Sequence, residues 1–519
     1  MPGANRFVLR FIKDPIHDLI EVSPRLSVFL DTRQFQRLRN IKQLGTSYYV
    51  WPGASHNRFE HCLGVAHLAK TLATNLQTKQ PDFGISDRDI ECVELAGLCH
   101  DLGHGPWSHV WDASFMPMAL PKLKTPWKHE QGSEMMFDYL VTTNNIEIEE
   151  ADTKFVKALI AGDPAKCDPS EKGFLFDIVA NKRNGLDVDK FDYFVRDSHM
   201  IGEPIKINLT RLLKSARVID GEICYDIKDA NNIYEVYNTR FRLYKQIYNH
   251  KTAAAIEYMI VDALLLAEPY LQIATRVFDP AKFTYLTDDI MTQIEYEALS
   301  NPDLAPAAAI FDRIRTRELY KSVDYKTVDW ADHKFFEGEI TPAKIVREAH
   351  NDMTEPSGLT PDDVIVSFSP MHYGLLDENP LRHVKFYSKA RPDVCAIAQP
   401  GDYSSLVPSV FGEVLLRVYT KKAEYYSDVQ AGYRALLSKI AGRPSVTVRT
   451  PPATETSSTP GPSRNNGVAA LDRSPGGSRY GENQFTTVER GYIPASPAKQ
   501  LKREVGNSEA EGSSKKKRP

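Results

Sequence analysis

The spacing of apolar residues predicts a mostly helical chain as far as about residue 300. Apolar side chains recur three and four positions apart, which places them on one face of an α-helix. This spacing predicts helices within residues 31–44, 58–76, 86–102, 127–140, 185–198, 231–251 and 253–267. Residues 13–24 predict a turn-rich entry, and the more polar residues 141–171 predict mixed helix and loop.

Residues at the ends of these segments indicate where helices begin and stop. Asp31 is a suitable N-cap for the first predicted helix, and Gly45 is a suitable stop. Ser86 followed three residues later by Asp89 has the pattern of a capping box. The pair at 184–185, Asn then Gly, predicts a break before the helix that follows.

The chain after residue 300 has a different pattern. Residues 364–368, 383–388 and 413–420 are short β-like runs that alternate with helical or turn segments. We therefore predict a helical domain over 1–300 and a smaller α+β lobe over 301–440. Residues 441–519 are rich in Pro, Ser, Thr and Gly and predict a disordered tail.

The end of this tail carries two basic clusters, KRE and SSKKKRP, about a dozen residues apart. Such a pair is typical of a bipartite nuclear-import signal, which predicts a location in the nucleus, with the cytoplasm as a second location. The alternative is a solvated, charged terminus. Ser496 in the sequence SPAK resembles a proline-directed kinase site.

Composition excludes several classes of protein. The 519 residues have a formal net charge of −4, which gives no global reason to expect binding to nucleic acid or to a membrane surface. The six cysteines lack CxxC spacing, so we expect free thiols. The start of the chain has no secretory-signal pattern, and no stretch approaches the roughly 18 apolar residues of a membrane span, so we expect an intracellular protein.

The densest candidate chemistry lies in LAGLCHDLGHGPWSH, residues 95–109. His100 and Asp101 stand at the end of an apolar helix, and His104 and His109 follow in a glycine-broken turn. A histidine at a helix C-terminus is also favoured by the helix dipole alone, and an adjacent Asp can simply pair with it. Partners elsewhere in the chain favour the functional interpretation.

Those partners complete a plausible metal site. A catalytic first-row divalent metal takes imidazole and carboxylate ligands and keeps open positions. His61, the His100–Asp101 pair and a later Asp supply two of each from three helices. The residues alone leave Asp187, Asp189 and Asp192 as alternatives for the last ligand.

Four stretches make a more specific match: NRFEHCLGV, AGLCHDLGHGPWSHVWD, WKHEQGS and NKRNGLDVDKFDYFVRDS. They resemble the deoxynucleoside triphosphate (dNTP) triphosphohydrolases of the HD superfamily, and the resemblance runs from about residue 11 to 436. Vertebrate members carry a sterile-alpha-motif domain ahead of this region, and none is expected here. The resemblance implies a metal-dependent hydrolase that releases tripolyphosphate intact from dNTPs and so controls the dNTP pool.

The resemblance also assigns roles to individual residues. It selects Asp189 as the fourth ligand beside His61, His100 and Asp101, with iron, zinc or manganese as the metal and Mg²⁺ accompanying the nucleotide phosphates. His109 is our predicted general acid, oriented by Asp112, and His129 is the competing choice. The implied catalytic residues are His104, His109, Asp112 and His129. The implied substrate-binding residues are Gln43, Leu44, Arg58, His104, His109, Lys190, Tyr193, Asp197, Arg240 and Tyr248.

The resemblance further implies an allosteric enzyme, in which GTP or dGTP and dNTP effectors join subunits into a tetramer, through a dimer–tetramer equilibrium. The implied effector-binding residues are Asp31, Gln36, Arg39, Val50, Arg211, Lys228, Asn232, His250, Lys251 and Lys421. Lys13, Asp226 and residues 394–401 depart from the family pattern, which weakens the expectation for the second effector site.

Two other functions compete with this one. The first keeps the metal site but acts on a cyclic nucleotide, a ribonucleotide or a nucleoside monophosphate; Leu44 and Tyr248, which are expected to crowd the 2′ position, argue against ribose. The second is a nucleic-acid-binding or scaffold protein with a vestigial site. Weak binding of nucleic acid through the basic tail is compatible with catalysis.

Overall fold

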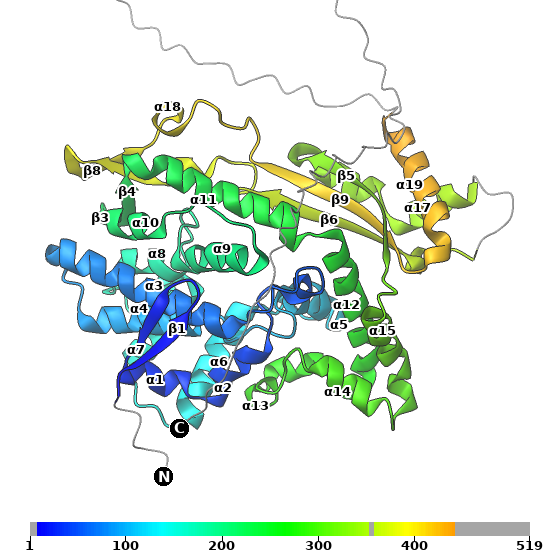
Figure 1. Cartoon of the computed structure of the whole chain (residues 1–519), viewed down its shortest axis with the longest axis horizontal. Helices are drawn as coiled ribbons and strands as arrows, with labels where there is room; N and C mark the ends of the chain where they lie inside the picture. Colours follow the sequence, from blue (N-terminus) through cyan, green and yellow to red (C-terminus); the bar gives the residue numbers. More distant parts are fainter. Residues whose placement is uncertain (1–7, 352–357, 442–519) are drawn as a thin grey trace, which may run out of the picture. The chain divides into compact units, whose positions relative to one another are not determined.

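The computed structural model describes residues 8–351 and 358–441, and these are mostly helical with small sheets (Figure 1). The predicted fold class is thereby confirmed. The predictions for the tail, including both basic clusters, fall outside the described residues. All six cysteines are free, as predicted. Among the described residues, every helix is too short or too polar to span a membrane.

Two long helices form the centre of the helical region. α3 (Arg58–Lys79) packs along α4 (Asp87–Cys99), and α9 (Val188–Ile201) packs on the other side of α3. The start of α4 is as predicted, because Ser86 and Asp89 form both hydrogen bonds of a capping box. The helix ends at Cys99, three residues before the predicted end, so His100 and Asp101 lie in the turn that follows.

The N-terminal segment differs from the prediction. Residues 13–24 belong largely to an antiparallel hairpin of β1 (Arg10–Asp14) and β2 (Asp18–Val22), followed by α1 (Pro24–Leu30). The predicted helix over 31–44 is wrong beyond its first turn: α2 spans only Arg33–Gln36 and continues as a 3-10 turn, Arg37–Asn40. Asp31 is not the N-cap, because the Thr32 hydroxyl accepts the Phe35 amide instead.

The remaining predicted helices are present as α6 (His129–Thr143), α11 (Ala230–Leu243) and α12 (Lys251–Leu271). The structure adds α7 (Glu150–Ala161), in the segment predicted as mixed helix and loop, and α10 (Leu209–Ser215), α14 (Ile290–Glu297) and α15 (Ala305–Arg315), for which no individual helix was predicted. Between α10 and α11 the chain forms a hairpin of β3 (Arg217–Ile219) and β4 (Glu222–Asp226), which the helical prediction missed. β4 pairs in parallel with β7 (Lys385–Ser388), which pairs with β8 (Arg391–Ile397).

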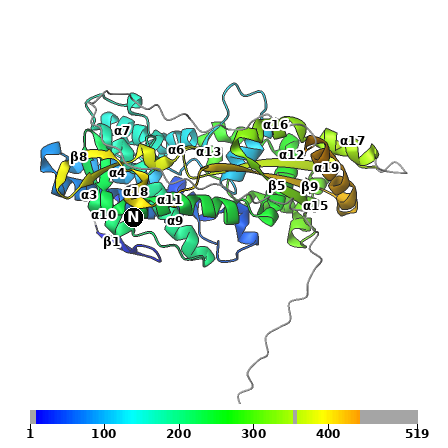
Figure 2. The ribbon, with the colours of Figure 1, turned by 90° about the horizontal axis from the view of Figure 1, so that it is seen from above.

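A second sheet lies later in the chain. β9 (Gly412–Thr420) is its central strand and pairs antiparallel with β5 (Lys321–Asp329) and β6 (Val364–His372). The helices α17 (Pro342–Asn351) and α19 (Tyr426–Ala441) pack together beside it (Figures 1 and 2). The predicted strands β6, β7 and β9 are confirmed, whereas β5 and β8 were missed.

The buried apolar residues form two clusters. The smaller one runs from Val323 to Ile440 and lies between this sheet and its helices. The larger one fills the helical region but also includes residues as late as Phe386 and Tyr419. A boundary at residue 300 therefore stays a prediction, since the main core draws on both sides of it.

Candidate active site

Four predicted metal ligands converge where α4 ends. His61 comes from α3, His100 and Asp101 from the turn after α4, and Asp189 from the first turn of α9. Nε2 of His61 lies 3.1 Å from Asp189 Oδ1 and 3.6 Å from Asp101 Oδ2. Nε2 of His100 lies 3.5 Å from an oxygen of each carboxylate. We call these four residues the HD group.

The donor atoms of the HD group fit a metal ion. His100 Nδ1 donates to the Gly97 carbonyl at 2.8 Å, so its Nε2 carries a lone pair, and this buried atom makes no hydrogen bond among the described residues. His61 Nδ1 donates to the carboxylate of Asp192 at 2.7 Å, which likewise leaves Nε2 free to ligate. Two imidazole nitrogens and two carboxylates suit zinc, iron or manganese.

Both carboxylates of the HD group are held in the ionised form. Burial alone would raise the pKa of Asp101, but Arg58, whose Nη1 lies 2.5 Å away, brings the pKa well below its usual value. Burial opposes ionisation of Asp189 as well, and the neighbouring His100 and His61 lower its pKa. The group therefore presents negative charge to a cation.

Behind His61 lies a buried ion network that the sequence interpretation missed. Asp192, considered there only as an alternative ligand, accepts from His61, from Arg196 Nε at 2.8 Å and from His17 Nε2 at 2.6 Å. Arg196 also donates to Asp14 at 2.8 Å, so the β1–β2 hairpin takes part. The i,i+4 spacing of Asp192 and Arg196 was the available signal.

A glycine makes room for this network. At Gly64, one turn after His61, a Cβ atom would lie 1.9 Å from Asp192 Oδ1 and 2.5 Å from Arg196 Nη2. Any larger residue would push α9 away from α3. The sequence contains this glycine in EHCLGV, but its purpose is visible only in the packing.

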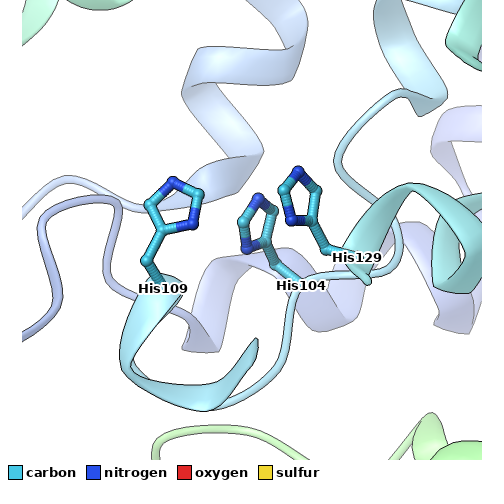
Figure 3. Close-up of side chains that lie close together, drawn as sticks. All are labelled: His104, His109 and His129. Atoms are coloured by element: carbon cyan, nitrogen blue, oxygen red, sulfur yellow. The ribbon is translucent and has the colours of Figure 1, made fainter. Parts of the chain in front are cut away.

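Three histidines form a second group beside the first, and we call them the histidine trio: His104, His109 and His129 (Figure 3). The rings of His104 and His129 stack with centroids 4.0 Å apart, and the His109 ring lies 5.1 Å from that of His104. His129 begins α6, and Gly103 lets α6 approach closely, because a Cβ there would lie 2.0 Å from the His129 carbonyl oxygen.

The partner of Asp112 is not the one predicted. Asp112 Oδ2 accepts from His129 Nδ1 at 2.6 Å, whereas His109 Nδ1 lies 3.5 Å from Oδ1. The His109 side chain is 66% exposed and that of His129 is 20% exposed. Burial would lower the pKa of His129, but the hydrogen bond and charge of Asp112 outweigh it and raise the pKa. Burial and Arg58 lower the pKa of His104, which is neutral.

Comparisons with known proteins agree with this arrangement. The HD domain model matches residues 58–168, and the HD associated region model matches 207–373. The deoxynucleoside triphosphate triphosphohydrolase SAMHD1 of Bos taurus is 42% identical over 449 residues, which cover 80% of this chain and 76% of the relative. This chain belongs to the HD-domain dNTP triphosphohydrolase family.

Other family members match over similar lengths. SAMHD1 of Homo sapiens is 42% identical over 462 residues, covering 80% of this chain and 71% of the relative. The SAMHD1 homolog of Dictyostelium discoideum is 36% identical over 448 residues, covering 86% and 84%. The HD domain match includes His61, His100, Asp101 and the histidine trio, and Asp189 lies between the two matched ranges.

Two of the residues predicted to face the sugar, Tyr248 and Asp197, are joined by a hydrogen bond. Tyr248 donates its hydroxyl to Asp197 Oδ2 at 2.6 Å, and His56 Nε2 lies 2.7 Å from Asp197 Oδ1. Gln43 is buried, and its Oε1 finds no hydrogen-bond partner in the described part of the chain. His56 was missed by sequence, although it lies in the turn just before α3. Leu44 is half-buried next to Gln43.

The residues predicted to face the substrate phosphates, together with Arg240, contact other parts of the protein. Arg58 holds Asp101 and also donates from Nε to Ser108 Oγ at 3.0 Å. Lys190 Nζ pairs with Asp187 at 2.8 Å. Arg240 donates to the His372 carbonyl and lies over the Tyr244 ring, 4.2 Å from its centroid. The Tyr193 ring centroid is 6.3 Å from that of His61.

The predicted effector residues are mostly engaged in local contacts. Arg211, Lys228 and Asn232 line one cavity of about 570 Å³. Asp226, the departure noted from sequence, accepts the Lys228 backbone amide at 3.0 Å. The contacts of the others are Asp31 with Arg10, Gln36 with Arg39, Lys421 with Asp262, and His250 with the Thr252 amide and the Trp51 ring. Val50 follows the short 3-10 helix Gly45–Tyr49, and Lys251 is the first residue of α12.

Proposed function

We propose that this protein hydrolyses dNTPs at the α-phosphorus and releases deoxynucleoside and tripolyphosphate. The observation that carries the proposal is the pair of imidazole Nε2 atoms facing two ionised carboxylates, next to a histidine that shares a short hydrogen bond with Asp112. The relatives named above supply the reaction, since their names state it.

Each group has a role in this proposal. A metal held by His61, His100, Asp101 and Asp189 would supply Lewis-acid activation of the α-phosphoryl group. Arg58 is available to neutralise phosphate charge. The leaving 5′ oxygen needs a proton, and His129 is suited to give it because Asp112 stabilises its protonated form. His109, the acid expected from sequence, is more exposed and lies farther from Asp112.

The sugar is selected by sterics in this proposal. The hydroxyl of Tyr248 is fixed by Asp197, which His56 fixes in turn. A fixed phenol ring together with Leu44 leaves little room for a 2′ hydroxyl, whereas Gln43 Oε1 is available to a 3′ hydroxyl. This favours deoxyribose over the ribonucleotide alternative.

The proposal also includes regulation, assembly and location. From the family resemblance we infer activation by GTP or dGTP and dNTPs, assembly into a tetramer, and control of the dNTP pool. From the tail sequence we infer a nuclear location. The choice among iron, zinc and manganese is open to elemental analysis of the purified protein.

A turnover assay tests the proposal. The wild type is incubated with each dNTP, with and without GTP, and the phosphate product is identified; tripolyphosphate is expected. The variant carrying His100→Ala and Asp101→Ala should release none, whereas Asp82→Ala, at an exposed aspartate, should match the wild type. Pyrophosphate or orthophosphate as the primary product, or an active double variant, would refute the proposal.

A further inference from the structure

Asp288 joins two backbone segments of the candidate active site. Its Oδ1 accepts the Trp107 amide at 2.6 Å, and its Oδ2 accepts the Lys42 amide at 2.9 Å. Its own amide donates to the Asn40 carbonyl at 3.1 Å. In the described structure, the hydrogen bonds of this carboxylate go to those two backbone amides. Asp288 lies outside every motif singled out in the sequence.

The two segments carry different parts of the proposed machinery. Lys42 directly precedes Gln43 and Leu44, the residues predicted to face the sugar. Trp107 lies two residues before His109, in the turn that also holds His104. One carboxylate therefore spans the sugar-facing segment and the turn of the histidine trio, although it lies 246 positions after Lys42 and 181 after Trp107 in the chain.

The turn at Trp107 needs such support. Trp107 and Ser108 have φ angles of 52° and 58°, a left-handed conformation that non-glycine residues adopt at a cost in free energy. Two such residues in succession persist only where surrounding contacts fix them. Ser108 contributes by donating to the Lys42 carbonyl at 2.7 Å.

A second contact ties the same turn to the segment of Asp288. The buried Arg37 donates to the carbonyls of Leu102 at 3.1 Å, His104 at 2.6 Å and Leu286 at 2.8 Å. The turn is thus held to the 286–288 segment at two points, through its carbonyls by Arg37 and through its amide by Asp288. Gly45 packs closely as well, since a Cβ there would lie 2.8 Å from the Trp107 carbonyl oxygen.

We propose that Asp288 is a positioning residue that sets the distance between the sugar-facing segment, residues 42–44, and the histidine-bearing turn, residues 104–109. The proposal rests on the proposed function, because it concerns how sugar recognition and proton donation are aligned on one substrate. An alignment error of about 1 Å is enough to lower the rate of a positioned reaction by about 10²-fold. Asp288 itself contacts no group assigned to the substrate.

The test compares three variants of the full chain. Asp288→Ala removes both acceptors, Asp288→Asn keeps one oxygen, and Asp289→Asn changes the neighbouring exposed carboxylate as a matched control. Five quantities are measured: kcat and KM for dCTP with GTP present, the ratio of dCTP to CTP hydrolysis, bound metal, and amide hydrogen exchange in peptides that cover 40–45 and 105–109.

For Asp288→Ala we expect faster exchange in both peptides, a 10- to 100-fold lower kcat, and a dCTP to CTP ratio reduced at least threefold, with bound metal unchanged. Asp288→Asn should fall between this variant and the wild type, and it replaces Asp288→Ala if that variant does not fold. Unchanged exchange, or faster exchange with kcat and the substrate ratio both intact, would overturn the proposal. A wild type that releases no tripolyphosphate would instead refute the proposed function, and exchange would still report on the contact.

Discussion

The HD group and the histidine trio lie side by side but are built differently. His61 is fully buried, and its Nδ1 is fixed by Asp192, which His17 and Arg196 hold in turn. In the trio, only His104 is comparably buried, and His109 is largely exposed. A metal site needs ligands fixed before the ion arrives, whereas a proton donor must meet a substrate that enters from solvent.

Asp192→Ala tests whether the HD group depends on its buried network, and we expect the largest effect from this variant. The change leaves Arg196 and His61 Nδ1 without their buried acceptor, and removing one partner of a buried ion pair costs about 3 to 5 kcal/mol. Urea unfolding should show that loss, and elemental analysis should show loss of bound metal. Asp192→Asn, which keeps the shape, should retain more metal; full metal content in both variants would show that the network does not support the site.

His129→Gln tests the other group. We expect kcat to fall by about 10²- to 10⁴-fold, the range of general acid catalysis, with bound metal and the thermal midpoint close to those of the wild type. His199→Gln, at an exposed histidine of α9, is the control. A variant that loses metal as well would mean that His129 supports the HD group and is not a separate proton donor.

Gly64→Ala tests how closely α3 and α9 must approach. The new methyl group would overlap Asp192 Oδ1, so the helices have to separate at a cost of about 1 to 3 kcal/mol. Gly173→Ala is the matched control, because a Cβ at Gly173 meets nothing within 4 Å. Equal unfolding free energies for the two variants would contradict the tight packing.

These residues show what sequence can and cannot predict. A local signal was sufficient for the capping box at Ser86, because it depends on neighbours in the chain. The family motif, and not local spacing, completed the set of four side chains of the HD group that the structure brings together. The capping of α2 by Thr32 rather than Asp31 was missed, since both residue types cap helices and the backbone of α1 decides between them.

Hydrogen-bond partners that lie far apart in the chain could not be predicted from the sequence. Asp288 bonds Lys42 across 246 positions, and His17 bonds Asp192 across 175, and neither pair has a local pattern. The β3–β4 hairpin was missed for another reason. Its strands are only three and five residues long, too short for an alternating pattern to stand out between helices.

His109→Gln should have a smaller effect than His129→Gln, about tenfold or less on kcat. His109 is exposed, and its Nδ1 lies 3.5 Å from Asp112 Oδ1, so the carboxylate stabilises a protonated His109 less than it stabilises a protonated His129. The comparison decides between the two candidate acids, because sequence favoured His109 and the hydrogen bond favours His129. A larger fall for His109→Gln would restore the original assignment.

The smallest expected effect is a shift of the pH dependence of kcat in the variant Asp112→Asn. Asp112 raises the pKa of His129 against the opposing effect of burial, so the wild-type imidazole stays protonated to a higher pH than an ordinary histidine. A proton donor works while protonated, and kcat should therefore be constant below this pKa and fall as the pH rises through it. With asparagine in place of the carboxylate, burial prevails and the pKa of His129 drops, so the alkaline limb of the kcat profile moves to lower pH. An unmoved limb would show that the titrating donor is not paired with Asp112, and the same profile measured on His109→Gln would then reveal whether that histidine supplies the proton.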